Sequence, residues 1–125
     1  MSAPFYVYVS GPLSDFPPQY LANVAAMTKM SRSLMELGLC PLNPAADLLE
    51  AIVNAAPLSL EAYQRRSMEL LQLLQGRHAA VFVVAKTHRN GAISSGVARE
   101  ITEATRLGIP VTYDVGSLLA VRAEA

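Results

Sequence analysis

The run Ala79-Ala80-Val81-Phe82-Val83-Val84 decides the fold of this chain, because an unbroken apolar run of this length fits a β-strand that is covered on both faces. A second run, Phe5-Tyr6-Val7-Tyr8-Val9-Ser10, has the same character and ends at Gly11-Pro12, which favours a turn. Strands of this kind belong to parallel sheets, whose connections are helices. We therefore expect these two runs to be neighbouring central strands.

The segments around these two strands alternate between helical and extended patterns. Apolar residues at helical spacing predict a helix over residues 19–38 and another over residues 59–76, which begins at the cap Ser59. Two prolines limit residues 39–44 to a brief strand near an edge of the sheet. Residues 45–56 fit either a short helix or a mobile flap. The remaining segments predict a helix from Ser94 to Gly108, a strand over residues 109–113 and a short helix over residues 115–122. Ser94 and Ser95 are cap candidates for the first of these helices, and Asp114 is either a residue of the carboxyl edge of the sheet or the cap of the last helix.

This order of elements predicts one α/β domain over residues 1–125, with a Rossmann-like parallel sheet of four to five strands and helices on both faces. A length of 125 residues, a hydrophobic content of 52% and a mean hydropathy of +0.29 suffice for one core. In such sheets, ligands bind beyond the carboxyl ends of the strands, at the point where the strand order reverses. We expect that point to lie between the two central strands.

The composition disfavours several classes of partner. Ten basic and ten acidic residues give a formal net charge of zero, which offers no electrostatic grip on a nucleic-acid polymer or a membrane, although a nucleotide needs only local charge. The single Cys40 forms no internal disulfide and is expected to be a buried small hydrophobe. No metal-site spacing is present, and no cofactor is expected. No segment has the length of an apolar membrane span, so we expect a cytoplasmic location.

The candidate site begins at the stretch Ser94-Ser95-Gly96-Val97-Ala98-Arg99-Glu100-Ile101. At about 100° per residue, Val97, Ile101 and Ala104 form the buried stripe of a helix, and Glu100 lies about 60° to one side of it. We expect a half-desolvated carboxylate at Glu100, and Arg99 in solvent as a surface partner of Glu103. The alternative is an ordinary capped helix with a glutamate at the boundary of the core.

The carboxyl ends of the two central strands bring small polar residues to one crevice. Ser10-Gly11-Pro12 follows one strand, and the other leads through residues 86–93 to Ser94. The hydroxyl of Tyr8 is placed to hydrogen-bond a carboxylate there, whereas the alternative is that Tyr6 and Tyr8 only pack against a sheet face. Lys86, His88 and Arg89 either supply cations to a phosphate or form a solvated loop.

Short motifs in a fixed order carry a resemblance to a known family. They are Tyr8-Val9-Ser10-Gly11-Pro12, Asn23, Gly38, Asn43-Pro44, Ser94, Gly96-Val97-Ala98-Arg99-Glu100-Ile101 and Gly108-Ile109-Pro110-Val111. This pattern resembles the nucleoside 2-deoxyribosyltransferase superfamily over almost the whole chain, and within it the small phage and bacterial branch that opens with Tyr-x-Ser-Gly-Pro. It is also similar to deoxynucleoside monophosphate N-glycosidases.

The resemblance implies a flavodoxin-like sheet, with Glu100 as a nucleophile that attacks C1′ of a deoxyribosyl group and Tyr8 as the residue that orients it. Ser94 stands where the monophosphate-hydrolysing relatives have a serine that holds the 5′-phosphate. The implied binding residues are Ser10, Gly11, Pro12, Asn43, Arg89, Ser94, Ser95 and Gly96. The resemblance further implies a homodimer or a higher homo-oligomer that completes each pocket with residues from a neighbour.

Two departures from the family pattern bear on activity. Arg77-His78 stands where the transferases commonly have an aspartate that handles the leaving base, and His78 is one candidate to replace it as a proton donor. Pro12 stands where monophosphate hydrolases have a serine. We therefore expect an N-glycosidase or deoxyribosyltransferase acting on a nucleoside 5′-monophosphate. The alternatives are a nucleotide-binding module without catalysis, which senses or sequesters its ligand, and a protein without a small-molecule ligand.

Overall fold

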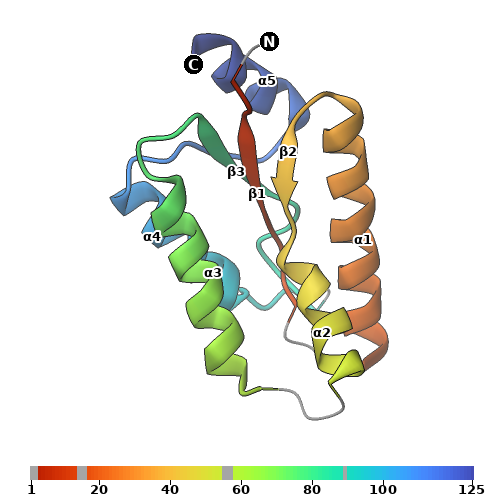
Figure 1. Ribbon diagram of the computed structural model, residues 1–125. Helices are drawn as coiled ribbons and strands as arrows, with labels where there is room; N and C mark the ends of the chain where they lie inside the picture. The colour runs from red at the N-terminus through yellow and green to blue at the C-terminus, as the bar shows by residue number, and fades with distance from the viewer. Residues whose placement is uncertain (1–2, 14–16, 55–57, 89) are drawn as a thin grey trace.

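The computed structural model describes residues 3–13, 17–54, 58–88 and 90–125, which form a parallel sheet with helices on both faces (Figure 1). The elements follow in the order β1 (Tyr6–Ser10), α1 (Pro17–Glu36), β2 (Cys40–Leu42), a 3-10 turn η1 (Pro44–Ala46), α2 (Asp47–Val53), α3 (Leu60–Leu74), β3 (Ala79–Val83), α4 (Ser95–Arg106), β4 (Val111–Thr112) and α5 (Val115–Glu124). The predicted α/β class and its alternation of strands and helices are confirmed.

The sheet has four strands in the order β2-β1-β3-β4, and every neighbouring pair is parallel. β1 and β3 are the central strands and pair along their whole length, with Tyr6 opposite Ala79 and Ser10 opposite Val83. The chain passes from β1 to β2 on one side and from β3 to β4 on the other. The strand order therefore reverses between β1 and β3, as the two apolar runs predicted.

Alternation along β1 sends successive side chains to opposite faces of the sheet. Val7 and Val9 pack with Phe82 against α1 and α5, whose buried residues there include Leu34 and Leu118. Tyr8 packs with the other side of β3 against α3 and α4 in a second cluster; its buried members on those helices are Leu71, Leu74, Val97 and Ala104. Figure 1 shows α3 and α4 together on one side of the strands and α1 on the other.

The predicted helix caps are present at the starts of α3, α4 and α5. Ser59 and Ser94 each accept a hydrogen bond from the backbone N–H three residues later, and the carboxylate of Asp114 accepts one from Ser117. Gly108 ends α4 with a φ of +74°, a left-handed conformation that favours glycine. These local signals explain why the observed bounds of α3 and α4 fall within a few residues of the predicted ones.

Three features differ from the expectations or extend them. In the segment 45–56, the expected short helix is present as α2, which follows the 3-10 turn η1, whereas residues 55–57 lie outside the described part of the chain. Cys40 is exposed and not buried, because it lies on the edge strand β2. None of the described helices is long and apolar enough to cross a membrane.

Candidate active site

Glu100 on α4 meets two hydroxyl groups that alternate along β1. The Tyr8 hydroxyl donates a hydrogen bond to Glu100 Oε2, and Ser10 Oγ donates one to Glu100 Oε1 at 2.9 Å. Tyr8 and Ser10 are fully buried, and Glu100 is 8% exposed. The two residues reach the carboxylate together because positions 8 and 10 point to the same face of the sheet. The predicted contact of Tyr8 with the carboxylate is confirmed, so Tyr8 does more than pack against the sheet.

Burial has the largest effect on the pKa of Glu100. Desolvation raises the pKa of Glu100, while the hydrogen bonds from Tyr8 and Ser10 and the positive charge of Arg99 oppose the rise. Burial and the nearby Glu100 carboxylate raise the pKa of Tyr8 well above its ordinary value. The Tyr8 hydroxyl therefore stays protonated and continues to donate its hydrogen bond to Glu100. Glu100 is more deeply buried than the half-desolvated position expected from the helical stripe.

A cleft with a volume of about 190 Å³ opens beside Glu100. It lies at the carboxyl ends of β1 and β3, where a parallel sheet of this order binds its ligands. Its lining is contributed by the turn after β1, by η1, α2 and α3, and by the β3–α4 loop with the start of α4: Gly11, Leu13, Pro44, Asp47, Leu60, Tyr63, Gln64, Ser67, Met68, His88, Ile93, Ser94, Ser95, Gly96, Arg99 and Glu100.

Most of the predicted site residues meet at this cleft. Gly11, Ser94, Ser95 and Gly96 line it together with Glu100. Tyr8 and Ser10 lie behind the carboxylate, where they hold it in place.

Gly11 leaves room for Met27, because a Cβ atom at position 11 would lie 2.9 Å from the sulfur of Met27 and would force that buried side chain to shift. Pro12 is buried next to Gly11 but does not line the cleft. The predicted contact of Pro12 with a substrate therefore has no support from its position.

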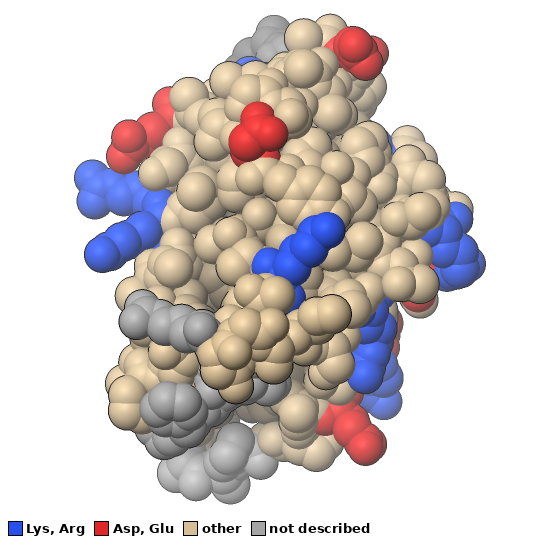
Figure 2. All heavy atoms as spheres, turned by 180° about the vertical axis from the view of Figure 1, so that it is seen from behind, with Lys and Arg blue, Asp and Glu red and all other residues tan. Residues whose placement is uncertain are grey.

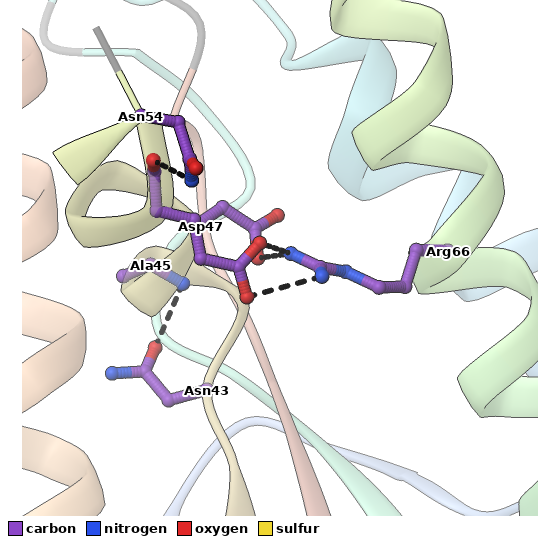
Figure 3. A network of polar contacts seen from close by, with 6 residues as sticks. Asn43, Ala45, Asp47, Asn54 and Arg66 are labelled. Carbon is purple, nitrogen blue, oxygen red and sulfur yellow. Dashed lines mark hydrogen bonds and ion pairs between the residues drawn. The ribbon is translucent and has the colours of Figure 1, made fainter. Parts of the chain in front are cut away.

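Two other predicted binding residues lie outside the cleft lining or outside the described residues. Asn43 caps η1, because its Oδ1 accepts a hydrogen bond from Ala45 N at 3.1 Å (Figure 3). Its Nδ2 donates a hydrogen bond to Thr28 Oγ1 at 3.4 Å. Its neighbour Pro44 lines the cleft, and Asn43 does not. The observed role of Asn43 is thus to shape the turn. Arg89 lies outside the described residues.

Arg99 is exposed, as expected, but its partner differs from the expected one. It lines the cleft, and its Nη1 donates a hydrogen bond to Gln64 Oε1 on α3 at 2.9 Å. Glu103, its expected partner, instead forms an ion pair with Arg106 at 2.5 Å. The reason is that α3 packs beside α4 and offers Arg99 an acceptor that a single helix cannot reveal.

The wall contributed by α2 and α3 was missed by the sequence reasoning. On α3, the lining residues lie at positions 60, 63 and 64, and 67 and 68, which are three or four residues apart and so share one face: Leu60, Tyr63, Gln64, Ser67 and Met68. The sequence contains this pattern: the polar residues Gln64 and Ser67 interrupt an otherwise apolar stripe, which could have indicated a site wall. Asp47 on α2 had no such signal.

Asp47 and Glu50 reach from α2 to a single guanidinium on α3. Arg66 Nη2 lies 2.5 Å from Asp47 Oδ1 and 2.9 Å from Glu50 Oε2, as Figure 3 shows for Asp47. This network joins the two elements that form one side of the cleft. Asp47 is the more buried carboxylate, with 22% of its side chain exposed against 53% for Glu50.

His78 lies away from the cleft. It precedes β3 at the amino end of the sheet, where its carbonyl oxygen accepts a hydrogen bond from Tyr6 N at 2.9 Å, and its side chain is exposed. The cleft lies at the opposite, carboxyl end of the strands. The hypothesis that His78 replaces the aspartate of the transferases is therefore wrong.

The surface carries no strong charge pattern on the face seen in Figure 2, where basic and acidic side chains are scattered among uncharged ones. Within the described ranges, no three or more histidine, cysteine, aspartate or glutamate side chains gather as a metal site would require. The cleft with its buried carboxylate is thus the best-formed candidate site. Comparison with protein-family models and with curated proteins finds no match to this chain.

Proposed function

We propose that the protein cleaves the N-glycosidic bond of a nucleoside 5′-monophosphate through a covalent intermediate on Glu100. The observation that carries this proposal is a carboxylate buried at the head of a cleft, with each oxygen held by a hydroxyl of β1. Burying a carboxylate whose direct partners are hydroxyl groups is costly to the fold, and this cost favours a role in function over one in stability. Hydroxyl partners fix its orientation and leave it capable of attack.

The proposed reaction follows the logic of a retaining glycosidase. A Glu100 oxygen forms a bond to C1′ while the C1′–N bond breaks and its electron pair leaves with the base. Water or a second base then attacks C1′, and the ester bond to Glu100 breaks. Tyr8 and Ser10 keep the carboxylate directed at C1′ during both steps.

The start of α4 supports a phosphate as the second anchor of the substrate. Ser94 Oγ accepts a hydrogen bond from Val97 N at 3.3 Å, and its own O–H proton remains a donor. Ser95 and Gly96 line the cleft at the amino end of the helix, where backbone N–H groups favour an anion. Arg99 adds a guanidinium to the same wall. A nucleotide substrate also agrees with the cytoplasmic location expected from the sequence, which remains a prediction.

The cleft volume of about 190 Å³ is below the roughly 300–1,000 Å³ of sites that enclose a drug-sized ligand. It suits a sugar phosphate, with the base toward the mouth. We propose that a second copy of the chain covers this mouth, in line with the homodimer or higher homo-oligomer implied by the resemblance. Leu49, Ile52 and Val53 are 66–71% exposed and offer an apolar surface on α2, the helix whose first residue, Asp47, lines the cleft. Light scattering that gives a monomer at high concentration would contradict this assembly.

The test is release of free base from a panel of deoxynucleoside 5′-monophosphates, followed by chromatography. We expect the Glu100→Gln variant to lose roughly 10³-fold or more of the rate, because the amide is no nucleophile. Glu69→Gln is the matched control: Glu69 is 65% exposed and pairs with Arg65 on the surface of α3. Release that persists undiminished in Glu100→Gln would overturn the assignment.

A nucleotide-binding module without catalysis is the second candidate, and the position of His78 favours it. With His78 away from the cleft, that residue cannot act on a leaving base. Nucleotide binding by calorimetry, with no base released over hours, would support this candidate. A protein without a small-molecule ligand would show no change of melting temperature with any nucleotide.

A further inference from the structure

Cleavage of an N-glycosidic bond needs a second group that moves a proton to or from the departing base. Among the described residues that line the cleft, the carboxylates are Glu100 and Asp47. We propose that Asp47 is the acid–base residue of this site: it donates a proton to the leaving base and then accepts one from the attacking water. This inference rests on the proposed function and assigns a group that the sequence reasoning missed.

The position of Asp47 brings the two carboxylates to one space from different elements. Asp47 is the first residue of α2, and Glu100 lies on α4. Both line the same cleft. The charge of Asp47 also acts on the Tyr8 hydroxyl, the group that donates to Glu100. Asp47 is therefore close to the residue that orients the nucleophile, and its environment is separate from that of Glu100, as two carboxyl groups with different tasks require.

The surroundings of Asp47 allow it to hold and release a proton. Arg66 carries one positive charge between two carboxylates, so Glu50 keeps the guanidinium paired when Asp47 is protonated. Burial raises the pKa of Asp47; the hydrogen bond and charge of Arg66 oppose the rise, and the negative charge of Glu50 adds to it. The other titratable groups that interact with Asp47 are Tyr8 from β1 and Tyr20 from α1.

The proton and electron balance of the two steps is complete. In the first, Asp47 gives its proton to a base nitrogen as the C1′–N electron pair moves to the base and Glu100 bonds to C1′. In the second, the Asp47 carboxylate takes a proton from water as the water oxygen bonds to C1′ and Glu100 departs. Asp47 ends protonated and Glu100 ionised, as both began.

The test compares two substrates that differ in their need for a proton. One is the nucleotide found in the panel, and the other is its analogue with an activated base, 7-methylated for a purine or 5-fluorinated for a pyrimidine. We expect Asp47→Asn to lose about 10²–10⁴-fold of kcat/KM, which reports the bond-breaking first step, on the ordinary nucleotide and about tenfold or less of kcat/KM on the analogue. On the analogue, kcat should fall as well, because hydrolysis of the intermediate still lacks the base that activates water. Glu100→Gln should lose activity on both.

Equal losses of kcat/KM for Asp47→Asn on both substrates, or no loss of kcat/KM on either, would overturn the role of Asp47 while leaving Glu100 as nucleophile. His88 also lines the cleft, and His88→Asn is the competing variant. If His88→Asn shows the substrate-dependent loss and Asp47→Asn does not, the proposal fails. If the wild-type protein releases base from neither substrate, the proposed function itself is overturned, and with it the reaction that Asp47 would serve.

Glu50→Gln separates proton transfer from the structural effect of breaking the ion pair. It disturbs the same guanidinium, but Glu50 does not line the cleft. Because the negative charge of Glu50 raises the pKa of Asp47, its removal should move the basic limb of the kcat/KM profile to lower pH. A merely structural network predicts a loss of melting temperature with no movement of that limb.

Discussion

The two faces of the sheet share the strand β1 but bury different chemistry. Toward α1 and α5, Val7 and Val9 join an apolar cluster, and the buried polar residues that α1 contributes, Gln19 and Ser31, are uncharged. Toward α3 and α4, Tyr8 joins an apolar cluster, while Ser10 and Glu100 are buried beside it at one end. The first face stabilises the fold, whereas the second carries polar groups whose desolvation opposes folding. Substitutions of single residues can test whether one face provides stability and the other the candidate site.

The largest expected effect on stability belongs to the apolar face. Leu34 is fully buried against β1, so Leu34→Ala should lower the free energy of unfolding by about 2–5 kcal/mol. Urea denaturation measures this change. The released base per folded molecule should stay at the wild-type value, because Leu34 packs on the side of the sheet away from the cleft.

Met35→Ala is the matched control for this variant. Met35 is the next residue of α1 and is 65% exposed, so its truncation should change the free energy of unfolding by no more than about 0.5 kcal/mol. An equal loss for both variants would remove the distinction between the apolar core and its surroundings. A loss of activity in folded Leu34→Ala would remove the distinction between the two faces.

A smaller effect is expected from Tyr8→Phe on the polar face, and it concerns activity where the Leu34 variant concerns stability. The ring still packs with Leu71 and Val97, but Glu100 loses the hydroxyl that holds Oε2. We expect kcat to fall by roughly 10–100-fold, equal to about 1.4–2.7 kcal/mol of the activation barrier, with KM little changed. Steady-state kinetics on the panel substrate measures both constants. A change confined to KM would mean that Tyr8 contacts the substrate and does not orient the nucleophile.

The smallest expected effect is a gain in the free energy of unfolding near pH 7 when the charged Glu100 is replaced by uncharged Gln. Burial raises the pKa of Glu100 above its ordinary value of about 4.5, so the folded protein binds the proton more tightly than the unfolded chain. The stabilisation that comes from this tighter proton binding is fully present below a pH of about 4.5. It is lost as the pH rises through the pKa of Glu100 in the folded protein. Glu100→Gln lacks this loss, since its amide offers both hydroxyls a partner.

We therefore expect Glu100→Gln to be more stable than the wild-type protein by about 0.5–2 kcal/mol at pH 7.5, with a smaller advantage at pH 4. Urea denaturation at the two pH values gives the comparison. An advantage that is equal at both values, or a loss at pH 7.5, would show that the buried carboxylate does not oppose folding.

Much of the architecture could be predicted from short stretches of sequence. The apolar runs at residues 5–10 and 79–84 identified both central strands, and the caps Ser59, Ser94 and Asp114 identified where three helices begin. Each of these signals acts through neighbours within a few residues of the chain. The contact of Tyr8 with Glu100 was also within reach, because the carboxyl ends of adjacent parallel strands share one edge of the sheet.

The far wall of the cleft was not predictable in the same way. Asp47 on α2 lines the cleft and pairs with Arg66 on α3, and Arg99 on α4 is hydrogen-bonded to Gln64 on α3. In both cases the partner depends on how the helices pack, which no local pattern encodes. Asn43 resembled a binding residue by motif, yet its side chain caps η1 through Ala45, two residues away.

The sequence by itself determined the parallel sheet, its central pair of strands, the helix starts and the residue type at the head of the cleft, because propensity, capping and periodicity are local properties of the chain. Only the tertiary structure decided which side chains meet there. Ser10 and Glu100 are 90 positions apart, and Arg66 and Asp47 are 19 apart. Such distances are set by the joint packing of several elements on the sheet, and this packing gives a buried glutamate two hydroxyl partners and a second carboxylate across the cleft.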